Sequence, residues 1–134
     1  MARLILDTGV LIAAVRARVD LAALADTDDV AVPAVAIAEY TAGVLLETDP
    51  ARAAAQHAFL DDVLTVVPTI DYDHSVATHH AALLAHTHRA GHRRGPHDLI
   101  IAATARATGR TLLTTDAHAH FDQLPDVTAH LITT

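Results

Sequence analysis

The chain has no cysteine, no lysine and no tryptophan, and each absence narrows the classes of site it can hold. Without cysteine it forms neither disulfides nor thiolate metal sites. Without lysine it cannot carry a P-loop, and it lacks the lysine that receiver domains and haloacid-dehalogenase-type phosphatases normally place beside their carboxylates. No Gly-x-Gly-x-x-Gly stretch is present, and the only serine, Ser75, lacks a nucleophile-elbow context.

Aromatic residues are also scarce, since only two Phe and two Tyr occur in 134 residues. The core must therefore consist of Ala, Val, Leu and Ile, and the length fits a single domain over residues 1–134. No apolar run approaches the roughly 18–20 residues of a membrane span, and Asp7 interrupts the start too early for a signal peptide. We expect a soluble protein of the cytoplasm with no membrane contact.

The charge is predominantly negative, with 16 acidic residues against nine Arg and a formal net charge of −7. This balance argues mildly against nucleic acid as a bulk partner. Eleven His would bring the charge to about +4 (−7 + 11) if all were protonated. Residues 86–94 also hold three Arg, three His and no acid, so Arg89, Arg93 and Arg94 are candidate RNA-phosphate contacts, although a solvated loop is the simpler alternative.

Short apolar segments alternate with helical patterns along the whole chain, which predicts an α/β fold with a mainly parallel sheet covered on both faces. The predicted strands are 3–6, 30–32, 66–67, 111–114 and 129–132. The predicted helices are 9–18, 21–24, 35–46, 50–64, a helix from the Asp73 or Ser75 cap to Ala90, and 98–108. In such folds functional groups gather at the carboxyl ends of the strands.

Four separated carboxylates carry the most information: Asp7, Glu39, Asp98 and Asp116. Asp7 and Asp116 each follow a predicted strand, Asp98 opens a predicted helix, and Glu39 is embedded in an apolar helix. If the fold brings the four together, they repel one another strongly unless a divalent cation lies among them. Such a cluster binds hard metal ions and can activate water against a phosphodiester.

Each acid also has a simpler structural interpretation. Asp7 and Asp98 could cap the helices that follow them. Asp116 could be a turn residue, and Glu39 could lie on a solvated stripe of its helix. The functional hypothesis therefore rests on the four positions taken together.

The histidines are weaker indicators. His79, His80, His86, His88 and His92 include helical spacings that could bind a transition metal, but a solvated helix face is the expected interpretation. His118 and His120 are expected to be surface turn residues, with a site-lining position as the alternative.

The sequence resembles the PIN domain. The resemblance is carried, in order and spacing, by Leu4-Ile5-Leu6-Asp7-Thr8, Ala36-Ile37-Ala38-Glu39, Pro96-His97-Asp98-Leu99-Ile100-Ile101-Ala102-Ala103 and Leu112-Leu113-Thr114-Thr115-Asp116. The length, and an ending that includes His120-Phe121-Asp122-Gln123-Leu124-Pro125, are similar to the VapC toxins of bacterial toxin–antitoxin pairs.

The resemblance implies an α/β/α sandwich with a five-stranded, mainly parallel sheet, and a Mg²⁺- or Mn²⁺-dependent endoribonuclease. It makes Asp7, Glu39, Asp98 and Asp116 the acidic site, with Asp7, Asp98 and Asp116 as metal ligands and Thr114 as the hydroxyl that supports a water. Thr8 is a weaker neighbour of the metal. The implied partners are a structured RNA (a tRNA or rRNA loop), a cognate VapB-like antitoxin and a second copy in a homodimer.

The sequence departs from the family pattern at several positions, and two other hypotheses stay open. Gly9 stands where Ser or Asn commonly follows the Asp-Thr pair, and Tyr40-Thr41-Ala42 replaces the more usual Leu-Arg-x after the Glu. Three residues also separate Asp116 from His120, more than in many relatives. A PIN-fold module that binds RNA or protein without turnover is the main alternative. A His-rich metal-binding protein is the other.

Overall fold

A five-stranded parallel sheet forms the centre of the computed structural model, which describes all 134 residues. The strand order is β3-β2-β1-β4-β5 and all four pairings are parallel. The strands are β1 (Arg3–Leu6), β2 (Asp29–Pro33), β3 (Thr69–Ile70), β4 (Thr111–Thr114) and β5 (Ala129–Leu131). The predicted α/β fold with a five-stranded parallel sheet is confirmed.

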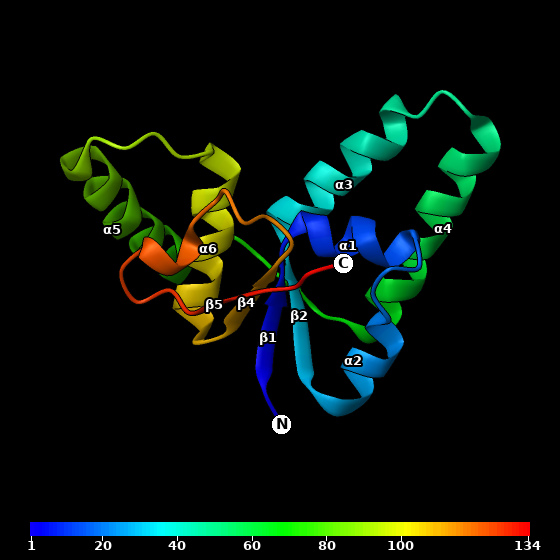
Figure 1. Ribbon diagram of the computed structural model, residues 1–134, viewed down its shortest axis with the longest axis horizontal. Helices are drawn as coiled ribbons and strands as arrows, with labels where there is room; N and C mark the ends of the chain where they lie inside the picture. The colour runs from blue at the N-terminus through cyan, green and yellow to red at the C-terminus, as the bar shows by residue number, and fades with distance from the viewer.

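Helices cover both faces of this sheet. They are α1 (Thr8–Val15), α2 (Leu21–Thr27), α3 (Ala34–Leu46), α4 (Pro50–Val66), α5 (His74–Ala90) and α6 (Pro96–Thr108), with a 3-10 turn at Phe121–Gln123. Figure 1 shows α1 to α4 on one side of the strands and α5 and α6 on the other. None of these helices is both long enough and apolar enough to cross a membrane.

The alternation of side chains along β1 explains the two-sided core. Leu4 and Leu6 pack into one apolar cluster with residues of α1, α3 and α4, whereas Ile5 packs into a second cluster with α5 and α6. All three are almost fully buried. Because successive strand side chains point to opposite faces, a central strand of three aliphatic residues can support both layers.

Two sequence predictions about element bounds are wrong, and both have a local cause. Val66–Val67 is not a strand, because the Val67 N–H still donates to Val63 O at the end of α4. The β3 strand begins only after Pro68, which cannot continue a helix. Helix α6 starts at Pro96 rather than Asp98, with Gly95 as its N-cap, because proline suits the first helical position.

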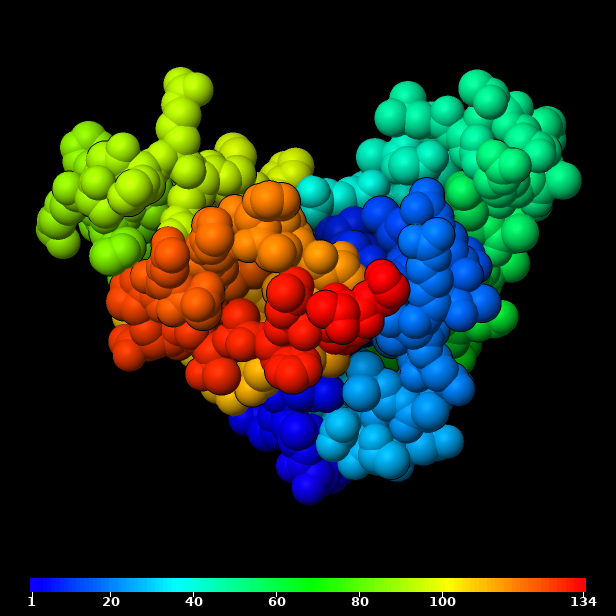
Figure 2. Space-filling model, viewed as in Figure 1, coloured from blue at the N-terminus to red at the C-terminus, as the bar shows by residue number.

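The strand order reverses at β1, since the chain runs outward through β2 and β3 and returns to the other side of β1 with β4. Ligands of open parallel sheets bind at such a switch point, beyond the carboxyl ends of the strands. Figure 2 shows a notch there, between a lobe that contains α5 and a lobe formed by the α3–α4 pair. The candidate site lies at the base of this notch.

Candidate active site

Asp7 follows β1 directly and is the most deeply placed of the four acids, with 7% of its surface exposed. Its Oδ1 accepts from the Thr8 N–H at 2.7 Å, so it does cap α1. Its Oδ2 accepts from Thr114 Oγ1, also at 2.7 Å. Capping uses only one carboxylate oxygen, so Asp7 can cap α1 and also belong to the acidic site.

The electrostatics of Asp7 reflect both its burial and its neighbours. Burial raises the pKa of Asp7 above its ordinary value. The hydrogen bonds from Thr114 and Thr8 oppose this rise, and the charges of Glu39 and Asp116 add to it. An anion in this position is stabilised by a cation that enters the notch.

Thr114, the last residue of β4, links the ends of the two neighbouring strands. Its buried hydroxyl donates to Asp7 Oδ2 and accepts from the Asp116 N–H at 3.0 Å. Asp116 Oδ1 in turn accepts from the His118 N–H at 2.9 Å, so the turn interpretation of Asp116 is also correct. Thr114 therefore fixes the position of Asp7 relative to Asp116.

Glu39 reaches the same place from α3. Its Oε1 accepts from Thr8 Oγ1 at 2.8 Å, and its Oε2 lies 3.3 Å from His97 Nδ1. The Glu39 side chain is 32% exposed, so it does not lie on a fully solvated stripe. The sequence does not by itself predict a role for His97. Its position next to Asp98 is the one feature of the sequence that points to the site.

Asp98 lies in the first turn of α6, and no backbone N–H donates to its carboxylate. The N-cap is Gly95, which makes no side-chain cap, so the capping interpretation of Asp98 is wrong. Burial raises the pKa of Asp98, the charges of Asp7, Asp116 and Glu39 add to the rise, and His97 opposes it. The fold thus brings four carboxylates from four segments within electrostatic reach.

The chemistry of this donor set suits a hard divalent ion. Carboxylate oxygens with no Arg among them are what Mg²⁺ and Mn²⁺ prefer. The side chains as placed do not converge on one point, because no three His, Asp or Glu residues are close enough to hold an ion together. Mg²⁺ commonly takes one or two carboxylates directly and keeps several waters, so the wider spacing fits a hydrated ion.

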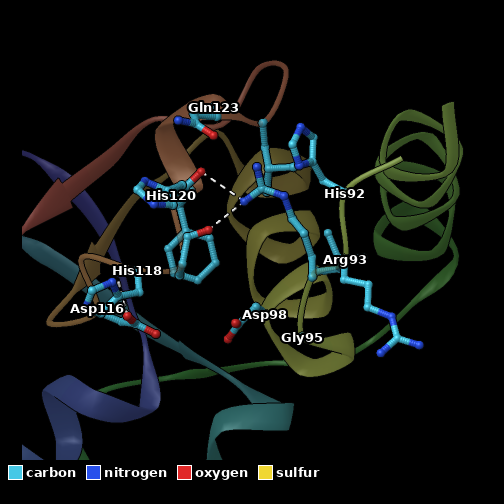
Figure 3. Close-up of a pocket in the computed structure, with 13 residues that line it drawn as sticks. His92, Arg93, Gly95, Asp98, Asp116, His118, His120 and Gln123 are labelled. Atoms are coloured by element: carbon cyan, nitrogen blue, oxygen red, sulfur yellow. Dashed lines mark hydrogen bonds between the residues drawn. The ribbon is translucent and has the colours of Figure 1, made fainter. Parts of the chain in front are cut away.

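A cavity of about 230 Å³ opens beside Asp98 and Asp116. Figure 3 shows both carboxylates at its base, with the 92–95 loop on one side and the segment after β4 on the other. Of the three predicted RNA-contacting arginines, Arg93 and Arg94 line this cavity, and Arg89 does not. Arg94 is already engaged, since its Nη1 donates to Ala119 O at 2.6 Å and His120 O at 3.0 Å.

The histidine predictions are confirmed in part. His118 and His120 are exposed, as expected of turn residues, but they also line the cavity beside the acids. His88 and His92 are exposed, as predicted for a solvated face, whereas His79, His80 and His86 are half-buried. The His80 ring contacts Tyr72, whose hydroxyl lies 2.8 Å from His80 Nδ1.

Fold and site define a class of protein: an α/β/α domain with carboxylates from four segments at the switch point of a parallel sheet. Residues 4–127 match the PIN domain, and the chain belongs to this family.

The structure is similar to solved toxin–antitoxin complexes. It matches a chain of VapBC2 from Rickettsia felis, bound to a promoter DNA fragment, with a TM-score of 0.85 and 23% identity over 97% of this chain and 98% of that one. It matches VapBC-5 from Mycobacterium tuberculosis with a TM-score of 0.79 and 29% identity over 98% and 100% of the two chains. The resemblance to the VapC toxins is therefore confirmed. A comparison with curated proteins gave no significant match.

Proposed function

We propose that this protein is the toxin of a VapBC-type toxin–antitoxin pair and acts as a Mg²⁺- or Mn²⁺-dependent endoribonuclease. The observation that carries the proposal is that Asp7, Glu39, Asp98 and Asp116 all lie around one notch, where burial and mutual repulsion raise the pKa of Asp7 and of Asp98. PIN domains are generally nucleases, and the similar structures are toxin–antitoxin complexes.

The residues divide the work by position. Asp7, Asp98 and Asp116 would hold the ion, which when bound would neutralise charge that develops on the phosphodiester and make water more acidic. Glu39 lies at the edge of the set, oriented by Thr8, where it can accept a proton from the attacking water. Thr114 keeps Asp7 and Asp116 in register across the two strands.

The proposed substrate is structured RNA cleaved within a loop, such as a tRNA or rRNA loop, with inhibition of translation as the result. The chain is acidic overall, which disfavours a large electrostatic interface with a duplex. Its local cations border the notch, where Arg93 lines the cavity next to Asp98. Single-stranded loops expose bases and bend their backbone, which suits a narrow notch.

The proposed partners are a VapB-like antitoxin and a second copy of the chain. The similar structures named above are complexes called VapBC, which supports an antitoxin partner. An antitoxin that placed a basic side chain among the four carboxylates would neutralise their charge and exclude the divalent ion. Homodimerisation is carried over from the family resemblance alone.

Cleavage of total bacterial RNA tests the proposal. Purified antitoxin-free protein should produce discrete 5′ ends in Mg²⁺ or Mn²⁺, none in EDTA, and at least about 100-fold fewer with Asp98→Asn, because one missing charge-stabilising group commonly costs that much in rate. His57→Ala, on the exposed surface of α4, is the control and should cut like the parent protein. Folded protein that cuts no RNA under these conditions would favour the binding module without turnover.

A further inference from the structure

The cavity beside Asp98 and Asp116 has a composition that catalysis by four carboxylates does not require. Its lining includes three imidazole rings, from His92, His118 and His120, and the amide of Gln123. Figure 3 shows the rings of His118 and His120 on the side formed by the segment after β4, with Asp98 across from them. These groups stack on and hydrogen-bond to flat, polar ligands.

The charge inside the cavity does not favour an anion. Two carboxylates line it, and of the two arginines only Arg93 is free of partners within the chain. The Arg94 Nη1 already donates to the carbonyl oxygens of Ala119 and His120. The guanidinium of Arg93 points away from His120 and Gln123 in Figure 3, towards the outer rim. A neutral ring therefore suits the interior better than a phosphate, which suits the rim.

The wall is also held in a defined shape. His120 has a left-handed backbone (φ 49°), an uncommon conformation for a residue other than glycine. The two bonds from Arg94 tie this residue and its predecessor to the loop before α6. Arg94 thus joins the two walls of the cavity, so that the segment carrying His118 and His120 is fixed relative to the loop before α6 before any ligand arrives.

We propose that this cavity is a base-binding subsite, which receives the unstacked base of the nucleotide next to the cleaved phosphodiester. The inference rests on the proposed ribonuclease function and adds the determinant of its specificity. Imidazole faces stack on the base, as histidine does in RNA-binding proteins, and the Gln123 amide bonds to its edge. Arg93 contacts the backbone of the neighbouring nucleotide.

The cavity is small enough to limit its occupant to a single base. About 230 Å³ is below the roughly 300–1,000 Å³ of pockets that enclose whole drug-sized ligands. The cavity lies directly beside two of the proposed metal ligands, so a base seated there would leave its own phosphate near the carboxylates. A base held in a helical stem could not enter, which restricts cleavage to unpaired positions.

The test uses short single-stranded RNAs that differ only at the nucleotides flanking one cleavage site. The parent protein should prefer one base at one flanking position in kcat/KM. Gln123→Ala and His118→Ala should each reduce that preference by about 10-fold, the usual size of a stacking or bidentate base contact. His57→Ala should leave it unchanged, and thermal melting should show that all variants fold.

A second measurement separates this inference from the proposed function. Amide NMR spectra are recorded with the four nucleoside 5′-monophosphates and with inorganic phosphate, in Mg²⁺. Shifts at residues 118–123 with nucleotides but not with phosphate support the subsite even if no RNA is cut. Equal shifts with phosphate alone, or cleavage whose base preference survives both variants, would overturn the subsite and leave the nuclease standing.

Discussion

Replacing Thr114 with valine tests the link between the two central strands, because it removes one hydroxyl and keeps the shape of the side chain. The hydroxyl is buried and makes two bonds, one to a carboxylate oxygen of Asp7 and one from the Asp116 N–H. A bond to a charged group contributes about 1.5–3 kcal/mol and a neutral one about 0.5–1.5 kcal/mol. Part of the loss is offset by the added methyl, so we expect Thr114→Val to cost about 2–3 kcal/mol at pH 7.

Urea denaturation in EDTA measures this cost. The double-mutant cycle with Asp7→Asn should give a coupling energy of about 1–2 kcal/mol, because Thr114→Val removes the bond and Asp7→Asn removes the charge that strengthens it. The penalty should shrink at low pH, since the Thr114 bond favours the ionised form of Asp7 and lowers its pKa. Thr111→Val, at the other end of β4, is the control and should stay within about 0.5 kcal/mol. A Thr114→Val loss no larger than that of the control, or no coupling to Asp7, would refute the reasoning.

Three further predictions concern other parts of the site. Burial and repulsion raise the folded-state pKa of Asp98 above 3.8. The contribution of Asp98 to stability is therefore present below that pH and is lost as the pH rises through the raised pKa. We expect Asp98→Asn to raise the metal-free melting temperature at pH 7 by a few degrees and to flatten the fall of the melting temperature with pH. Arg94→Ala should lower the free energy of unfolding by about 1–3 kcal/mol, because two carbonyl oxygens lose a charged donor. Gly9→Ala should lower the free energy of unfolding by about 1 kcal/mol, since its new Cβ would collide with Thr115 Oγ1. Gly43→Ala, in open space within α3, should raise the free energy of unfolding by up to about 1 kcal/mol in the same denaturation assay.

The strands at the centre of the fold are predictable from the sequence because their signal is local. Arg3–Leu6 and Thr111–Thr114 are short apolar segments bounded by an acid or a turn, and both occur as predicted. Placing Asp7 and Asp116 at one edge then needs only the rule that parallel strands end together. Val66–Val67 was misplaced because two apolar residues do not distinguish a helix end from a strand.

The parts of the site that sequence reasoning missed depend on contacts between distant segments. Arg94 and the His120 carbonyl are 26 residues apart, and His97 and Glu39 are 58 apart. No periodicity or motif encodes such pairs, because they depend on how α6 packs beside the segment after β4 and opposite α3. The cavity was equally hidden in the sequence, because its walls come from the loop before α6 and from the segment after β4.

Titration of the metal-free protein with Mn²⁺, followed by electron paramagnetic resonance of the free ion, tests the central claim that Asp7, Asp98 and Asp116 hold a divalent ion. We expect saturable binding of one or two ions per chain at up to millimolar Mn²⁺, weakened at least about 10-fold by Asp98→Asn and unchanged by His57→Ala. Binding that is absent at millimolar Mn²⁺, or that survives Asp98→Asn undiminished, would contradict the account.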